Sequence, residues 1–93
     1  MEYRVLVIDA HPKIRQVLRA ILVAHADLAV IGEAADGVEA VGMASDLRPD
    51  IILMDVQMPK MDGIQATKII KAQQPQITVI GMSANDSPLL KGR

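Results

Sequence analysis

Short apolar runs alternate along the chain with longer stretches whose apolar residues have helical spacing. The runs at 4–8, 28–34, 51–54 and 77–82 are rich in aliphatic side chains and are bounded by polar or turn-forming residues. Such runs are typical of strands that are buried on both faces of a parallel sheet. Within 14–22, apolar residues recur at i, i+3, i+4, i+7 and i+8, which is the spacing of one helix face. The pattern predicts four strands separated by three helices.

Polar residues at the predicted helix starts support these boundaries. Pro12 suits the first turn of the first helix. Asp36 precedes Glu39 by three residues, and Asp62 precedes Gln65 by three, which is the spacing of a capping box. Each pair opens a helix that we expect to end shortly before the next proline, because proline cannot continue a helix.

Alternating strands and helices predict an α/β fold with right-handed crossovers and a doubly wound parallel sheet. We expect a flavodoxin-like strand order of 2-1-3-4. Ser87–Pro88 has the signature of another helix start, but only 89–93 follow. Compared with the common five-stranded domain, the last strand and most of two helices are missing. We therefore expect residues 1–93 to form a single, C-terminally shortened domain.

Composition excludes several classes of function. Aromatic residues make up 1% of the chain, namely Tyr3 alone, so neither a stacking platform for nucleic acid nor an aromatic ligand pocket is expected. A net charge of -1 argues against direct nucleic-acid binding by this segment. Cysteine is absent, which excludes disulfides and thiolate sites. Apolar stretches are far shorter than a membrane span, and no leader is evident, so we expect a cytoplasmic protein.

Three polar residues follow the predicted strands where a parallel sheet binds ligands: Asp9, Asp55 and Ser83. In the expected strand order, Asp9 and Asp55 face each other across one strand spacing of about 4.8 Å. Their charges would repel by roughly 3 kcal/mol at an effective dielectric constant of about 20. Mg²⁺ would relieve this repulsion. The site then suits a carboxylate nucleophile that accepts a phosphoryl group, steadied by the metal and a hydroxyl.

Other sites at the same position fit less well. A dinucleotide site needs a Gly-rich loop after the first strand, but the chain has Asp9-Ala10-His11-Pro12 there. An aspartate-nucleophile phosphatase is the nearest enzyme alternative, yet its usual Asp-x-Asp would require an acid in place of His11. We interpret His11 as a residue of the helix start, and His25 as a residue late in the helix that complements its dipole.

Three segments carry a family resemblance: VLVIDAHPKIRQVL, IILMDVQMPKMDG and VIGMSA. They resemble the response-regulator receiver domain of bacterial two-component systems, in the subclass usually joined to a helix-turn-helix DNA-binding module. The resemblance covers about the first three quarters of a receiver. It implies that Asp55 is the phospho-acceptor, that Asp9 and the backbone carbonyl of Gln57 hold Mg²⁺ with Asp55, and that Ser83 is the switch hydroxyl. A sensor histidine kinase is the implied partner, and the domain is implied to be no enzyme, since a receiver only assists its own phosphorylation and dephosphorylation.

Two departures from the family lead us to expect impaired phosphorylation. Ala10 stands where the family has a second acid, which is usually the direct metal ligand. The family's last strand, its lysine and the final helix have no counterpart, and the uncovered sheet face and edge then predict a homo-oligomer. The alternative function is a phosphorylation-independent dimerisation or interaction module, or an inactive receiver remnant. A boundary inside a longer regulator stays open as well.

Overall fold

The computed structural model describes residues 2–82, in which strands and helices alternate without exception. The elements are β1 (Tyr3–Ile8), α1 (Pro12–Val23), β2 (Leu28–Ala34), α2 (Gly37–Leu47), β3 (Ile51–Asp55), α3 (Gly63–Gln73) and β4 (Thr78–Met82). The predicted four strands and three helices are confirmed. Ser83 and the predicted helix start at Ser87–Pro88 lie outside the described residues.

All strand pairings are parallel, and the order in the sheet is β2-β1-β3-β4. Val5 is paired with Ile51 on one side, and Ile51 with Thr78 on the next strand. The predicted order is therefore confirmed, and β1 and β3 are the two central strands. Because all strands run the same way, the carboxyl ends of β1 and β3 meet at one edge of the sheet.

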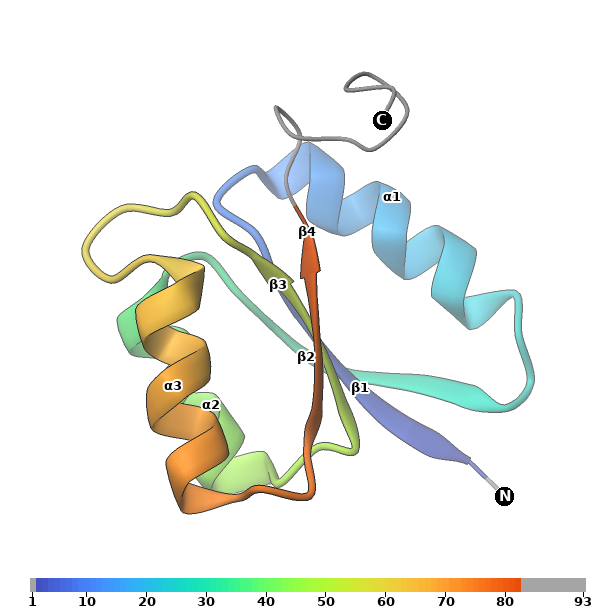
Figure 1. The fold of residues 1–93 in the computed structure, drawn as a ribbon. Helices are drawn as coiled ribbons and strands as arrows, with labels where there is room; N and C mark the ends of the chain where they lie inside the picture. Colours follow the sequence, from blue (N-terminus) through green and yellow to red (C-terminus); the bar gives the residue numbers. More distant parts are fainter. Residues whose placement is uncertain (1, 83–93) are drawn as a thin grey trace, which may run out of the picture.

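Helices cover the two faces of the sheet unequally: α2 and α3 lie together on one side, and α1 lies alone on the other (Figure 1). The main core lies between the sheet and the α2–α3 pair, and it contains Leu6, Ile8, Ile52, Met54 and Ile70. Ala40, Ala44 and Ala66 also belong to it. These small side chains on α2 and α3 let the helix backbones approach the strands and each other.

Helix α1 forms where its apolar spacing predicts it, but its apolar face is only partly covered. None of its residues is buried, and Val17 and Ile21 are each 55% exposed. Leu18 and Leu22 are half-buried. The apolar spacing therefore predicted the helix correctly but not the burial of its apolar face. Within residues 2–82, no second helix packs beside α1 to cover that face. Over the same residues, no helix is long and apolar enough to cross a bilayer.

Both predicted capping pairs are confirmed. The Asp36 carboxylate accepts a hydrogen bond from the Glu39 backbone N–H at 2.8 Å, and the Asp62 carboxylate accepts one from the Gln65 N–H at 2.8 Å. The Glu39 carboxylate accepts in return from the backbone N–H of Ala35 at 2.7 Å. These bonds satisfy amides that a helix N-terminus leaves unpaired, and so they place the starts of α2 and α3.

Candidate functional site

Three polar side chains are buried within residues 2–82: Asp9, Asp55 and Gln74. Gln74 has a structural contact, because its side-chain N–H donates to the carbonyl of Ala44 at 3.0 Å and ties the end of α3 to α2. Asp9 directly follows β1, and Asp55 is the last residue of β3. A buried carboxylate is costly unless it is paired, hydrogen-bonded or bound to a cation. The edge formed by β1 and β3 is therefore the candidate site.

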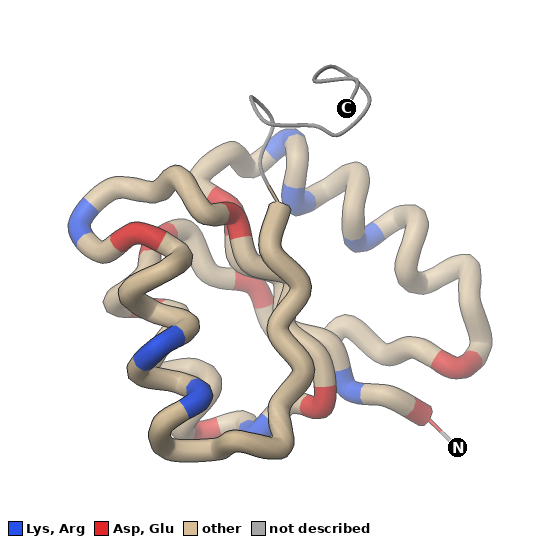
Figure 2. The backbone as a smooth tube through the Cα atoms, in the orientation of Figure 1, with Lys and Arg blue, Asp and Glu red and all other residues tan. Residues whose placement is uncertain are grey.

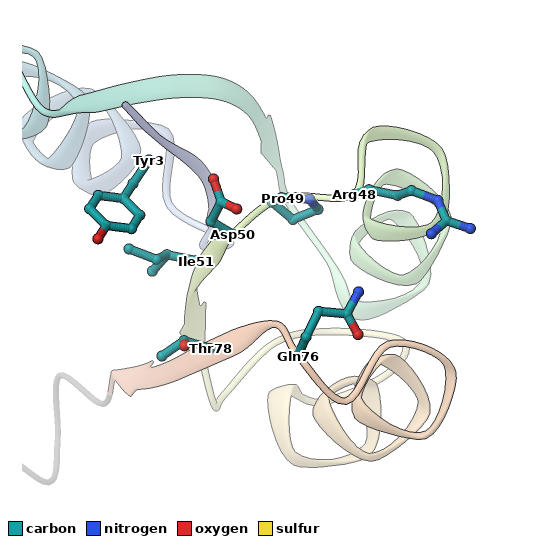
Figure 3. A pocket seen from close by; sticks show the side chains of 7 residues that line it. All are labelled: Tyr3, Arg48, Pro49, Asp50, Ile51, Gln76 and Thr78. Carbon is teal, nitrogen blue, oxygen red and sulfur yellow. The ribbon is translucent and has the colours of Figure 1, made fainter. Parts of the chain in front are cut away.

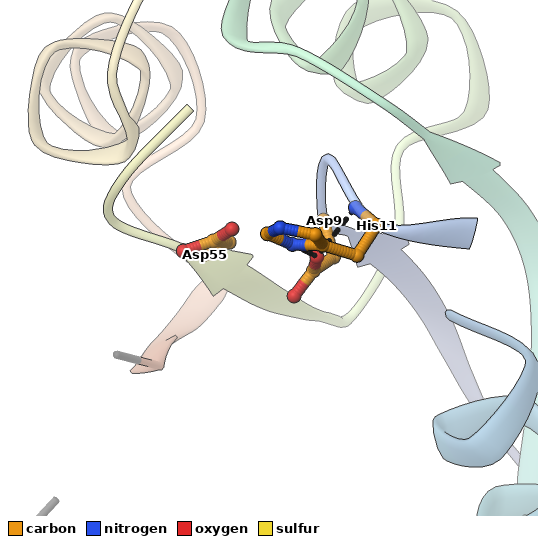
Figure 4. Close-up of side chains that lie close together, drawn as sticks. All are labelled: Asp9, His11 and Asp55. Atoms are coloured by element: carbon orange, nitrogen blue, oxygen red, sulfur yellow. Dashed lines mark hydrogen bonds and ion pairs between the residues drawn. The ribbon is translucent and has the colours of Figure 1, made fainter. Parts of the chain in front are cut away.

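Asp9, Asp55 and His11 converge at this edge (Figure 4). One potential ligand atom from each of the three lies within 4.8 Å of the other two. The His11 backbone N–H donates to Oδ1 of Asp9 at 2.8 Å, and its ring Nδ1 lies 3.1 Å from the same oxygen. Oδ1 of Asp55 accepts from the backbone N–H of Gln57 at 3.0 Å. Each carboxylate is thus oriented by the backbone two residues later.

Arg15 on α1 holds the backbone of Asp9. Its Nη1 donates to the Asp9 carbonyl at 2.6 Å, and its Nε donates to the carboxylate of Glu33 on β2 at 3.2 Å. Arg19 donates to the other Glu33 oxygen at 2.8 Å. The Asp9 N–H in turn donates to the carbonyl of Ala34 at 3.0 Å. Helix α1 and strand β2 together fix the direction in which the Asp9 side chain leaves the sheet.

Gly63 brings the start of α3 against Asp55. Its backbone N–H donates to the carbonyl of Val56 at 3.2 Å, which closes the loop that follows β3. A Cβ atom at Gly63 would collide with the backbone carbonyl oxygen of Asp55, so only glycine permits this approach. The segment between Asp55 and α3 is consequently a tight loop beside the buried carboxylate.

Lys60 anchors the same loop to the start of α2. It has a positive φ of 68°, and its Nζ lies 3.4 Å from Oδ2 of Asp36. The backbone N–H of Glu39, and after it Lys60, stabilise the Asp36 carboxylate and hold its pKa below the ordinary value of 3.8. This pair joins two loops at the carboxyl edge of the sheet. Lys60 itself is engaged with Asp36 and not with Asp9 or Asp55.

The donor set at this edge fits a divalent cation. Two carboxylates within 4.8 Å supply the negative charge and the hard oxygen ligands that such ions prefer. Ala10, between Asp9 and His11, supplies no side-chain oxygen. The ring of His11 lies close enough to be a third ligand.

The structure brings together the residues that the sequence predicts as neighbours, Asp9 and Asp55. Gln57 lies with its backbone against the Asp55 carboxylate, while the metal-ligand role of its carbonyl stays a prediction, as does the role of Ser83. The interpretation of His25 was wrong: α1 ends at Val23, and His25 lies in the turn beyond it. His11 was missed as a member of the cluster. The spacing Asp9-x-His11 was the available signal.

A separate pocket of about 350 Å³ lies at the opposite edge of the sheet (Figure 3). Tyr3, Ile51 and Thr78, which line it, belong to the amino ends of their strands. Asp50 in this pocket accepts a hydrogen bond from the backbone N–H of Arg4 at 2.8 Å, which joins β1 to the segment before β3. None of the predicted site residues lines this pocket, and it is distinct from the Asp9–Asp55 edge.

Known proteins share this fold and much of this sequence. The transcriptional regulatory protein LiaR of Bacillus subtilis (strain 168) is 49% identical over 85 residues, which are 89% of this chain and 40% of that protein. The response regulator domain of Thermotoga maritima CheB superposes with a TM-score of 0.85 at 44% identity, over 90% of this chain and 62% of that one.

A third similar structure is a CheX-CheY-BeF3-Mg⁺² complex from Borrelia burgdorferi, with a TM-score of 0.84 and 33% identity. The match covers 96% of this chain and 68% of that one. The matched residues make up 40% of LiaR, so this chain spans less than half of the length of that protein. Residues 5–91 match the family described as the response regulator receiver domain. With the sheet order, the paired carboxylates and the identity to these relatives in agreement, the chain belongs to the response regulator receiver domain family.

Proposed function

We propose that this domain receives a phosphoryl group on Asp55 from a sensor histidine kinase, and that residues 1–93 act as one receiver unit. The observation that carries the proposal is the pair of buried carboxylates, Asp9 and Asp55, at the carboxyl ends of the two central strands. Asp55 is 7% exposed, so it is shielded from most of the solvent. Membership of the receiver family supports the same assignment.

In the proposed reaction, a carboxylate oxygen of Asp55 attacks the phosphorus of a phosphohistidine on the kinase. The new O–P bond forms as the P–N bond breaks, and the electron pair returns to the kinase imidazole, which takes up a proton from solvent. Oδ1 of Asp55 accepts the Gln57 N–H, so the carboxylate is held in one orientation and Oδ2 is the oxygen available for attack. A bound divalent cation supplies charge neutralisation for the carboxylates and the incoming phosphoryl oxygens.

We assign the cation to Asp9, Asp55 and the backbone carbonyl of Gln57, with Mg²⁺ as the ordinary occupant in this family. Ser83 is proposed as the hydroxyl that responds to phosphorylation. Ala10 contributes no ligand oxygen, and we expect weaker Mg²⁺ binding and slower phosphoryl transfer than in receivers with an acid there. The His11 ring places a nitrogen donor, which suits Mg²⁺ poorly, beside the two carboxylates.

Phosphorylation of the domain would act either on the rest of a longer protein or on a second copy of this chain. LiaR, of which the match covers 40%, is a transcriptional regulatory protein, so control of transcription by a longer protein is the favoured output. Acidic and basic positions are interspersed along most of the backbone, although α1 and α3 carry only basic ones (Figure 2). With a net charge of -1, we do not assign nucleic-acid binding to this segment. Self-association through the uncovered sheet face or the edge strand stays a prediction.

Intact-mass spectrometry tests the assignment of Asp55. The protein is incubated with acetyl phosphate and Mg²⁺, and one added phosphoryl mass is expected in the wild type. Asp55→Asn should remove the adduct, because an amide is not a phosphoryl acceptor. Asp27→Asn, at an exposed position in the α1–β2 turn, is the matched control and should keep it. An adduct that persists in Asp55→Asn would contradict the assignment of Asp55 and place the phosphoryl group on another residue. No adduct in the wild type would contradict the proposal and favour a phosphorylation-independent interaction module.

A further inference from the structure

We propose that His11 is a third ligand of the cation site, and that it makes the site prefer borderline divalent transition metals, such as Co²⁺ and Zn²⁺, over Mg²⁺. The inference deepens the proposed function and rests on it in one respect, namely that Asp9 and Asp55 hold the cation. It concerns a nitrogen ligand at a position that the sequence analysis assigned only to the start of α1.

The position of the His11 ring is the first support. His11 is the N-cap residue of α1, yet its side chain makes no capping hydrogen bond to the helix. The ring lies instead against Asp9, with Nδ1 at 3.1 Å from Oδ1, and on the side of Asp55 (Figure 4). One ring nitrogen is within 4.8 Å of an oxygen of each aspartate. Ligand atoms that share one ion, with bonds of about 2.0–2.2 Å, lie at most about 4.4 Å apart, so a small movement of the ring or of a carboxylate would bring all three atoms onto one ion.

The three ligands differ in burial in the way that an exchangeable metal site requires. Asp9 and Asp55 are 6% and 7% exposed, whereas the His11 side chain is 72% exposed. The imidazole therefore approaches the carboxylates from the solvent side and leaves room for water or a phosphoryl oxygen as a further ligand. An open coordination position of this kind is the mark of catalytic rather than structural metal sites.

The chemistry of the donor set gives the selectivity. Mg²⁺ is held by oxygen ligands at near-octahedral geometry and gains little from an imidazole. Co²⁺, Ni²⁺ and Zn²⁺ bind imidazole readily, and their affinities for mixed N/O sites exceed that of Mn²⁺. Ala10 removes one possible oxygen ligand while His11 adds a nitrogen. Both residues raise the affinity of the site for a transition metal relative to its affinity for Mg²⁺.

A purely structural role for His11 makes a different prediction. If the ring only oriented Asp9 through the bond to Oδ1, its removal would weaken binding of every cation by a similar factor. If it binds the metal, its removal weakens binding of Co²⁺ and leaves Mg²⁺ nearly unchanged. The ratio of the two affinities therefore separates a ligand from a positioning residue.

Isothermal titration calorimetry of the whole chain with Co²⁺ alone and with Mg²⁺ alone measures this ratio. We expect His11→Ala to lower the Co²⁺ affinity by about tenfold or more, and the Mg²⁺ affinity by less than about twofold. His25→Ala, which removes the other histidine at an exposed turn, should change neither. Ala10→Asp should raise the Mg²⁺ affinity and so reduce the preference of the site for Co²⁺ over Mg²⁺. His11→Phe keeps a ring of similar size and must reproduce His11→Ala if the lost nitrogen is responsible.

A second readout follows the ring itself. On addition of Zn²⁺, the ¹⁵N resonances of the His11 imidazole should shift, those of His25 should not, and Asp55→Asn should weaken the effect. Equal losses for Co²⁺ and Mg²⁺ in His11→Ala, or an unshifted His11 ring, would overturn the inference. The receiver proposal would survive that outcome if Asp55 still gains a phosphoryl mass with Mg²⁺. A shifted His11 ring without any adduct would support the metal site and contradict the phosphorylation proposal.

Discussion

The two buried carboxylates should destabilise the cation-free protein, and removing one charge should stabilise it. Asp55→Asn is the appropriate change because it keeps the size of the side chain and the Oδ1 acceptor that binds the Gln57 N–H. We expect this variant to unfold at higher urea concentration than the wild type when EDTA is present. The same reasoning applies to Asp9→Asn, whose Oδ1 accepts from the His11 N–H.

The magnitude follows from the separation of the charges. Oxygens of Asp9 and Asp55 lie within 4.8 Å, and two unit charges at that distance repel by about 3.5 kcal/mol at an effective dielectric constant of about 20. The backbone N–H groups that donate to each carboxylate offset part of this repulsion. We therefore expect a coupling free energy between the two charges of about 1 to 3 kcal/mol.

Urea denaturation at neutral pH and low salt measures this coupling in a double-mutant cycle. The four proteins are the wild type, Asp9→Asn, Asp55→Asn and the double variant, each with EDTA and then with Co²⁺ or Mg²⁺. Each single variant should gain stability, and the double variant should gain less than the sum, because the second change removes no repulsion. Asp27→Asn is the surface control and should shift the free energy of unfolding by less than about 0.5 kcal/mol. Added cation should stabilise the wild type and hardly affect Asp55→Asn.

Additive effects in this cycle would refute the reasoning, because additivity means that the two carboxylates do not interact. A loss of stability in both single variants would refute it as well. Such a loss would show that the hydrogen bonds of the carboxylates stabilise the protein by more than the repulsion between them destabilises it. A cation would then have no net repulsion to relieve.

Three further predictions concern the surroundings of the site. Gly63→Ala should destabilise the protein by about 2 kcal/mol or more, because the new Cβ would collide with the Asp55 carbonyl; Gly42→Ala, whose Cβ would meet nothing within 4 Å on α2, should be neutral or stabilising in the same urea titration. The depressed pKa of Asp36, caused first by the Glu39 N–H and then by Lys60, stabilises the fold above its ordinary value of 3.8, and this contribution is lost as the pH falls through the lowered pKa. Asp36→Asn should therefore lose less stability than the wild type in an acid titration below about pH 4, and an unchanged acid profile would contradict the assignment. Light scattering at micromolar concentrations should show an oligomer that Val17→Glu, on the exposed face of α1, converts to monomer; a monomeric wild type would disprove self-association.

Much of the fold follows from local sequence. The strand runs, the 3.6-residue spacing in α1 and the capping pairs at Asp36 and Asp62 depend on residues within about four positions of each other. Parallel crossovers then restrict the strand order, and the order β2-β1-β3-β4 puts Asp9 beside Asp55. Burial was less predictable: the apolar face of α1 forms as expected, but its cover depends on which elements pack against it.

The sequence by itself therefore determined the order of the elements, the receiver resemblance and the two acids that end the central strands. Only the tertiary structure decided what surrounds those acids. The packing of α1 on β1 and β2 brings Arg15 to the Asp9 carbonyl and Glu33, and it turns the His11 ring towards Asp55, 44 positions further along the chain. Contacts of this kind arise from the way helices lie on a twisted sheet, a property of the whole fold that no local pattern encodes.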